Sequence, residues 1–304
     1  MSERILVIRH GALGDIVLSF GPFAAIRKHH PGAHIVLLTT APYAEFCRAS
    51  GLFDEIWLDE RAPAWRIDKI LALRRRLNAG GFRRVYDLQT SDRSSAYFRL
   101  FGNPPPEWSG IARGCSHPHA NPRRDFMHTV ERQAEQLKTA GIADIPPTDL
   151  SWVKADEARF GLVRPYALLV PGGSKHRPEK RWPAERYADL AKRLSARGLA
   201  VGVLGGPDEA GLAGALFGTR DLTGQTSFAD IVALARGAAL AVGNDTGPMH
   251  LIAAAGCPSV VLFSSASDPA LCAPRGRAVM VLRAPDLAGL SVDEVEAASS
   301  AKAR

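Results

Sequence analysis

From residue 4 to residue 15 the chain reads Arg-Ile-Leu-Val-Ile-Arg-His-Gly-Ala-Leu-Gly-Asp. Residues 5–8 are an uninterrupted run of branched apolar side chains, which is typical of a strand buried on both faces of a parallel sheet. A turn with two glycines follows, and residues 15–30 then have helical spacing that ends at Pro31-Gly32. A buried strand followed at once by a helix is the repeating unit of α/β proteins, so this stretch predicts the fold class.

The same alternation of strand and helix recurs along the rest of the chain. Further strands are predicted at 34–39, 54–58, 83–88, 166–170, 199–204, 240–242, 259–263 and 279–282. Further helices are predicted at 42–50, 124–140, 184–197, 227–236 and 248–255, and another helix is predicted to end near residue 80. Residues 102–122 contain five prolines and cannot be mostly helical. Because Pro146-Pro147 marks a linker between two alternations, we predict two Rossmann-like domains, residues 1–150 and 151–304, with parallel sheets facing an interdomain cleft.

The composition limits the class of protein. Hydrophobic residues make up 46% and charged residues 23% of the 304 residues, which suits a globular protein. No run of about 18 apolar residues is present, so we expect no membrane span, and the first residues do not resemble a secretory signal. The formal charge of +7 suits an anionic partner, but no dense basic tract with aromatic residues indicates nucleic acid. Four scattered cysteines predict free thiols rather than a metal or redox site.

The loop after the first strand carries Gly14 and Asp15. Gly14 allows a tight turn or the close approach of another molecule. Asp15 at the helix start can act as an N-cap that satisfies free N–H groups, or it can be a general base presented at the edge of the sheet. The glycines do not fit the dinucleotide-binding fingerprint, which disfavours an oxidoreductase.

Loops after strands of the second half are candidates for binding a nucleotide. Residues 171–174, Pro-Gly-Gly-Ser, offer N–H groups and a hydroxyl to an anion, with Lys180 as a cation; a solvated basic loop is the alternative. Residues 205–209, Gly-Gly-Pro-Asp-Glu, offer carboxylates to ribose hydroxyls, or simply begin a helix. Residues 243–250, Gly-Asn-Asp-Thr-Gly-Pro-Met-His, join a strand to a helix N-terminus and form the strongest candidate anion site.

These residues together resemble glycosyltransferase family 9, the ADP-heptose:lipopolysaccharide heptosyltransferases. The resemblance extends over residues 3–300 and rests on residues 6–15, 180–183, 243–250 and 262–269. It implies a GT-B fold and an inverting transfer of a heptose or related sugar from an ADP-sugar, without a metal or other cofactor. His10-Gly11-Ala12 replaces the residues rich in Ser and Thr that precede Leu-Gly-Asp in the family.

The resemblance assigns roles to particular residues. Asp15 is the implied catalytic base, and Lys180 contacts the donor diphosphate. Pro207 occupies the family's ribose-binding position, so Asp208 or Glu209 takes that role here. The predicted donor-binding residues are Gly173, Ser174, Lys180, Glu209, Asp245, Thr246, Gly247 and His250. The predicted acceptor-binding residues are His10, Gly14 and Arg93, with Arg99, Arg113, Arg123 and Arg124 as further candidates or ordinary surface arginines.

The resemblance also implies the partners. The acceptor is an anionic glycolipid of the lipopolysaccharide core type, which the positive charge suits. We expect a cytoplasmic protein in peripheral contact with the inner membrane, although no segment suited to insertion into lipid stands out. Two alternatives stay open: a family member with another nucleotide sugar or surface-glycan acceptor, and a non-catalytic nucleotide-sugar-binding protein.

Overall fold

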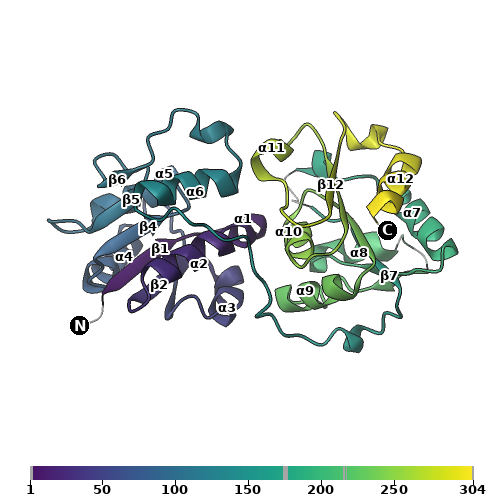
Figure 1. Ribbon diagram of the computed structural model, residues 1–304, viewed down its shortest axis with the longest axis horizontal. Coiled ribbons are helices and arrows are strands. Elements are labelled where there is room, and N and C mark those ends of the chain that lie inside the picture. The colour runs from purple at the N-terminus through teal and green to yellow at the C-terminus, as the bar shows by residue number, and fades with distance from the viewer. Residues whose placement is uncertain (1–2, 174–176, 215, 217, 303–304) are drawn as a thin grey trace. The chain divides into compact units, whose positions relative to one another are not determined.

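A computed structural model describes residues 3–173, 177–214, 216 and 218–302 of the chain (Figure 1). The chain divides into two compact units, Met1–Thr148 and Asp149–Arg304. Each unit is built on one six-stranded sheet in which all the paired strands are parallel. The predicted α/β class with two parallel sheets is confirmed.

The N-terminal unit has the strand order β3-β2-β1-β4-β5-β6. Its strands are β1 (Arg4–Ile8), β2 (His34–Thr39), β3 (Glu55–Leu58), β4 (Arg84–Asp87), β5 (Glu107–Gly110) and β6 (His117–Pro118). The pairing of Ile8 with both Leu38 and Asp87 places the carboxyl ends of β1, β2 and β4 beside one another. The loop that follows β1 therefore begins at the point where the strand order reverses.

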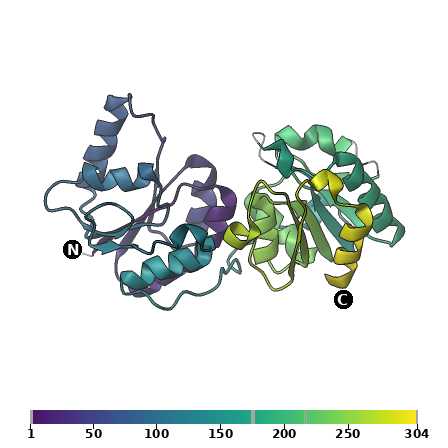
Figure 2. The same cartoon turned by 90° about the horizontal axis from the view of Figure 1, so that it is seen from above.

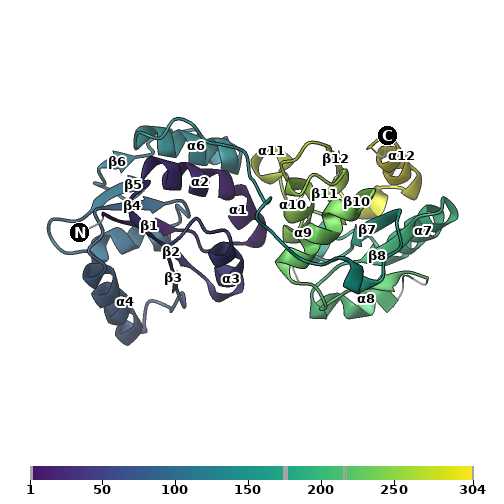
Figure 3. The same ribbon diagram turned by 60° about the horizontal axis from the view of Figure 1, so that its bottom comes forward.

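Helices cover both faces of this sheet. They are α1 (Leu13–Leu18), α2 (Phe20–His29), α3 (Ala41–Ala49), α4 (Ile67–Ala79), α5 (Asp92–Ala96) and α6 (Thr129–Thr139), with 3-10 turns η1 (Tyr97–Leu100) and η2 (Arg124–Phe126). Figure 3 shows α2 and α6 on one side of the sheet and α4 on the other. Leu6 and Ile8 of β1 pack in a buried cluster with Leu77 of α4 and Tyr97 of η1.

The C-terminal unit has the strand order β12-β11-β10-β7-β8-β9. Its strands are β7 (Tyr166–Val170), β8 (Ala200–Val203), β9 (Arg220–Asp221), β10 (Leu240–Asn244), β11 (Ser259–Phe263) and β12 (Val279–Arg283). Its helices are α7 (Ala184–Ala196), α8 (Ala210–Gly214), α9 (Phe228–Gly237), α10 (Gly247–Ala254), α11 (Pro269–Cys272) and α12 (Val292–Lys302), with 3-10 turns η3 (Ala158–Phe160), η4 (Pro178–Lys180), η5 (Pro207–Glu209) and η6 (Leu287–Gly289). Numbered within each unit, the strands of both sheets run 3-2-1-4-5-6, which is the Rossmann order.

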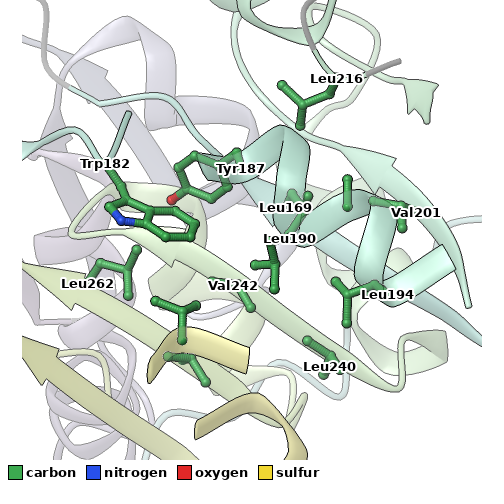
Figure 4. Packing of buried hydrophobic residues seen from close by; sticks show 14 of the residues in the cluster. Leu169, Trp182, Tyr187, Leu190, Leu194, Val201, Leu216, Leu240, Val242 and Leu262 are labelled. Carbon is green, nitrogen blue, oxygen red and sulfur yellow. The ribbon is translucent and has the colours of Figure 1, made fainter. Parts of the chain in front are cut away.

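Trp182 and Tyr187 anchor the main core of the C-terminal unit (Figure 4). Their rings meet edge to face with centroids 4.8 Å apart, a favourable arrangement for aromatic pairs. The indole N–H donates to the carbonyl of Leu290 at 2.9 Å. Because Trp182 is fixed in this way, the segment immediately before it is held against the end of the sheet.

Several elements differ from the sequence-based predictions. The helix predicted at 15–30 is interrupted at Ser19, because Pro22 has no N–H for the preceding turn and the Ser19 hydroxyl donates to the Asp15 carbonyl at 2.6 Å. The helix predicted from residue 124 begins at Thr129, after a 3-10 turn. The helix α12 was not predicted, yet it packs beside α7 and buries Val295 (Figure 1).

The cysteines are free, as predicted, and three of the four are buried. Among the helices of the described residues, none combines the length and the apolar character that crossing a bilayer requires.

Candidate active site

Asp15 lies in the first turn of α1, beyond the carboxyl end of β1. It is not the N-cap, as one interpretation of the sequence held, because Ala12 occupies that position. The carboxylate Oδ2 accepts the backbone N–H of Ala12 at 3.1 Å, and Oδ1 lies 2.9 Å from Nη2 of Arg9. Since a carboxylate offers about four lone-pair positions and the side chain is 38% exposed, it can still accept a further hydrogen bond from a bound hydroxyl.

Arg9 is a buried cation whose role the sequence did not reveal. Its side chain is 2% exposed, and Nη1 donates to the carbonyl of Leu88 at 2.6 Å. Burial lowers the pKa of its guanidinium, and the carboxylates of Asp15 and Asp87 oppose that shift. Arg9 therefore ties the ends of β1 and β4 together and orients Asp15. The only sequence signal was a charged residue directly after a buried apolar strand.

His10 lies in a buried polar cluster. Its Nε2 is 2.9 Å from Oδ2 of Asp59, and the Tyr97 hydroxyl donates to the same carboxylate oxygen at 2.7 Å. Burial alone would raise the pKa of Asp59, but the contacts with His10 and Tyr97 and the N–H of Arg61 outweigh it and hold that pKa at about 2. The predicted contact between His10 and an acceptor stays a prediction, and its imidazole is 3% exposed.

The tight turn lies at Gly11 rather than at Gly14. Gly11 has a φ of +115°, and a Cβ at this position would lie 2.2 Å from the Tyr43 ring. Gly14 instead lies within α1 and is buried. A glycine is therefore required at residue 11 for both backbone conformation and space.

Cations surround the Asp15 side of the N-terminal sheet. Arg124 donates to the Thr90 hydroxyl at 2.9 Å, and its side chain is 14% exposed. Burial lowers the pKa of the Arg132 guanidinium, the positive charges of Arg124 and Arg9 lower it further, and the Asp15 carboxylate opposes the shift. These mutual effects require the groups to lie near one another, so an anion could bind beside Asp15. Arg132 had not been predicted.

The other arginine candidates of this unit lie elsewhere. Arg93 belongs to α5 and donates to the carbonyl of Ala62 at 2.8 Å, so it supports the loop before α4. Arg99, Arg113 and Arg123 are exposed. Their contact with an acceptor stays a prediction.

In the C-terminal unit, Asn244 at the end of β10 joins three segments. Its amide nitrogen donates to the carbonyls of Pro171 and Gly172 at 2.8 and 3.1 Å. Its oxygen accepts from the backbone N–H of Trp182 and from the Tyr187 hydroxyl, each at 3.0 Å. The side chain is wholly buried, so all four bonds are protected from water. Asn244 therefore positions the glycine loop after β7 and the segment before Trp182.

The structure brings Lys180 to the loop after β10. Its Nζ lies 2.6 Å from Oδ2 of Asp245, and the Ser267 hydroxyl donates to the same oxygen at 2.7 Å. An ammonium has three N–H donors, so two stay available for an anion. Asp245 thus holds Lys180 in place, while its direct contact with a donor stays a prediction.

Glu209 reaches the glycine loop from the turn after β8. Its Oε2 accepts the N–H of Gly206 at 2.8 Å, and a Cβ on Gly172 would lie 2.8 Å from its Cγ. The Arg181 guanidinium lies 3.8 Å from Oε1 of Glu209 and donates to the Gly173 carbonyl at 2.6 Å. Glu209 and Gly173 are therefore neighbours, whereas Ser174 lies outside the described residues. Arg181 was not among the predicted site residues.

The helix α10 completes this group of residues. Thr246 is its N-cap and Gly247 its first residue. Their backbone N–H groups therefore have no hydrogen-bond acceptor within the helix. His250 lies on the first turn with its side chain buried. Together with Lys180, this helix start forms an electropositive position at the carboxyl end of β10, which suits a phosphate group.

Across residues 3–173, 177–214, 216 and 218–302, no group of three or more His, Cys, Asp or Glu side chains is arranged to hold a metal ion. Independence from metal nevertheless stays a prediction.

The fold and these two groups of residues define a class, the GT-B glycosyltransferases. The chain is similar to E. coli ADP-heptose LPS heptosyltransferase II, with a TM-score of 0.78 and 22% identity over 99% of this chain and 98% of that one. It is also similar to a glycosyltransferase family 9 structure from Veillonella parvula, with a TM-score of 0.84 and 22% identity over 99% and 97% of the two chains.

Sequence comparison narrows the class to a family. The model of glycosyltransferase family 9 (heptosyltransferase) matches residues 70–298. Lipopolysaccharide heptosyltransferase 2 of Escherichia coli K12 is 31% identical over 312 residues, which cover 92% of this chain and 88% of that protein. This chain belongs to glycosyltransferase family 9.

Proposed function

We propose that this chain transfers a heptose, or a closely related sugar, from an ADP-sugar to an anionic acceptor of the lipopolysaccharide core type. The observation that carries the proposal is the Asp15 carboxylate, 38% exposed and held by buried Arg9 at the end of the first strand. Residues 1–150 would bind the acceptor and residues 151–304 the donor. The relative named lipopolysaccharide heptosyltransferase 2, at 31% identity, supports this choice of substrates.

The proposed reaction is a single displacement with inversion and without a metal. The acceptor oxygen bonds to the anomeric carbon as the bond from that carbon to the diphosphate oxygen breaks. Asp15 takes the hydroxyl proton, and the ADP leaves with additional negative charge. Lys180 and the N–H groups of Thr246 and Gly247 are preorganised donors for that charge, with Asp245 and His250 completing their surroundings. Gly173, Ser174 and Glu209 are assigned to the nucleotide and its phosphates.

The acceptor is proposed to meet the cations near Asp15. Arg124 and Arg132 would bind its phosphate or carboxylate groups, and contacts of His10, Gly14 and Arg93 with the acceptor stay predictions. Such an enzyme would act in the cytoplasm in peripheral contact with the inner membrane. Nucleic acid is not a proposed partner.

A product assay tests the proposal. The purified chain is mixed with heptose-free lipopolysaccharide core acceptor and one of several donors: ADP-heptose, ADP-glucose or UDP-glucose. Mass spectrometry is expected to find one added heptose with ADP-heptose alone. Addition of another sugar would support the alternative donor, and saturable ADP-heptose binding without any product would support a non-catalytic binding protein.

A further inference from the structure

The segment from the end of β3 through α4 is unusually exposed. Of the thirteen residues of α4 only Leu77 is buried. Six large hydrophobic side chains are exposed in the described part of the chain, and Leu58, Trp65, Ile67 and Leu71 are four of them. Figure 2 shows α4, in blue, standing at the outer edge of the N-terminal unit. Most of the exposed large apolar side chains of the described residues therefore lie within one segment, residues 58–71.

The helical spacing places two of these side chains on one face of α4. Ile67 and Leu71 are four residues apart in α4 and so lie on the same face of the helix. Trp65, which is 79% exposed, lies two residues before Ile67, which is 65% exposed. Large apolar side chains that are left in water close together in the chain are typical of interaction sites.

The same segment is strongly basic. Residues 60–76 contain six basic and two acidic residues, a balance of +4. The two acids are already paired, Asp68 with Arg66 at 2.9 Å and Glu60 with Lys69 at 3.0 Å. The remaining basic residues include Arg74 and Arg75, both exposed. An apolar face bordered by cations is complementary to a lipid bilayer, which has anionic headgroups at its surface and an apolar interior.

A cavity lies beneath this segment. It has a volume of about 570 Å³ and opens between the loop before α4, α4 itself, and α5 with η1. Its apolar lining includes Leu58, Ile70, Leu73 and Leu100. The cavity explains why so little of α4 is buried, because α4 is not packed tightly on the structure below it.

We propose that Trp65, Ile67 and Leu71, with the neighbouring arginines and Lys69, form a surface that docks on an anionic phospholipid bilayer. The proposal rests on the proposed function in one respect, since a glycolipid acceptor places the reaction at a membrane. Trp65 suits the boundary between headgroups and acyl chains, and the nearby basic residues are attracted to the headgroups of an anionic leaflet.

Vesicle sedimentation tests the surface. The full chain is mixed with vesicles of phosphatidylcholine alone or of phosphatidylcholine with phosphatidylglycerol. Wild type is expected to bind only the anionic vesicles, and the double variant Trp65→Ser with Ile67→Ser is expected to lose about tenfold in partitioning. The control, Phe126→Ser with Val163→Ser, alters side chains of similar exposure elsewhere and is expected to bind as wild type does. Equal loss in both double variants, or no binding by wild type, would overturn the proposal.

Two further measurements separate other outcomes. If a second copy of the chain covers the patch, Trp65→Ser with Ile67→Ser converts a wild-type dimer to a monomer in light scattering, and membrane docking is rejected. Transfer to a soluble, deacylated acceptor is expected to be unchanged in this variant, and its loss would place the patch in the catalytic machinery instead. Should wild type lack transfer but bind anionic vesicles, the proposed function fails while the docking surface stands.

Discussion

The two units have the same strand order, but their fourth strands end in different residues, an acid in the N-terminal unit and a neutral amide in the C-terminal unit. The fourth strand of each sheet ends in a wholly buried polar residue, Asp87 in β4 and Asn244 in β10. In the N-terminal unit the acid lies near buried Arg9, which orients the Asp15 carboxylate. In the C-terminal unit the neutral amide organises a loop and a helix start around a cation. Shared topology therefore places both groups of candidate residues at the carboxyl ends of the strands, and a few buried polar groups decide which side chains are held there.

The largest expected effect comes from removing the base of the N-terminal unit. Asp15→Asn keeps the size of the side chain and an oxygen for Arg9, but the amide cannot take a proton at neutral pH. We expect transfer to fall by about 10²-fold or more, with ADP affinity unchanged because the donor residues belong to the other unit. Initial rates of ADP release and calorimetry measure the two effects.

The matched control for this variant is Asp293→Asn. Asp293 also lies in the first turn of a helix and pairs with an arginine, Arg193, but on an exposed surface. Its rate should equal that of wild type. Full activity in Asp15→Asn would reject the assignment of the base.

The next effect tests the buried amide of the C-terminal unit. Asn244→Ala leaves four buried hydrogen-bonding groups without their partner, so we expect unfolding to require about 2 kcal/mol less. ADP binding should weaken as well, because the glycine loop loses its attachment. Urea unfolding measures the first effect, with Gln225→Ala, an exposed amide with one bond to Asp221, as the control. Unchanged stability would show that Asn244 does not organise the loop.

In both units, local patterns in the sequence predicted some elements, whereas features that depend on distant contacts were missed. Strands such as 34–39 and 166–170 were predicted to the residue, because buried parallel strands are short apolar runs between turns. The helix α12 was missed because its Ala/Ser-rich sequence has little periodicity, and its burial depends on packing against α7. Arg9 and Asn244 lie within recognised motifs, but their partners lie about 60 to 80 residues away, so only the fold could show their roles.

A smaller effect is expected for the cation of the C-terminal site. Lys180→Ala removes two N–H donors proposed to meet the diphosphate, and ADP affinity should fall about tenfold, which corresponds to about 1.4 kcal/mol. Calorimetry measures the change. Lys192→Ala is the control, because Lys192 also pairs with an aspartate, Asp189, but on the exposed side of α7. An affinity equal to wild type would reject a contact between Lys180 and the diphosphate.

The smallest effect concerns Asp87, the acidic counterpart of Asn244. Burial raises the pKa of Asp87 to about 6, although the N–H of Thr90 donates to its carboxylate at 3.0 Å. The folded chain therefore binds more protons than the unfolded chain between pH 4 and 6, and stability falls as the pH rises through about 6.

The dependence of stability on pH should disappear when Asp87 is replaced by asparagine, the residue found at the equivalent strand end of the C-terminal unit. From pH 5 to pH 7 the titration of Asp87 should cost about 1 kcal/mol of unfolding free energy, and Asp87→Asn should abolish that slope. Urea unfolding at the two pH values measures it. Asp230→Asn is the control, because hydrogen bonds from Ser227 and the ion pair with Arg159 outweigh burial and lower the pKa of Asp230, so its contribution is constant above pH 5. A slope in Asp87→Asn equal to that of wild type would show that another group titrates in this range and would reject the raised pKa of Asp87.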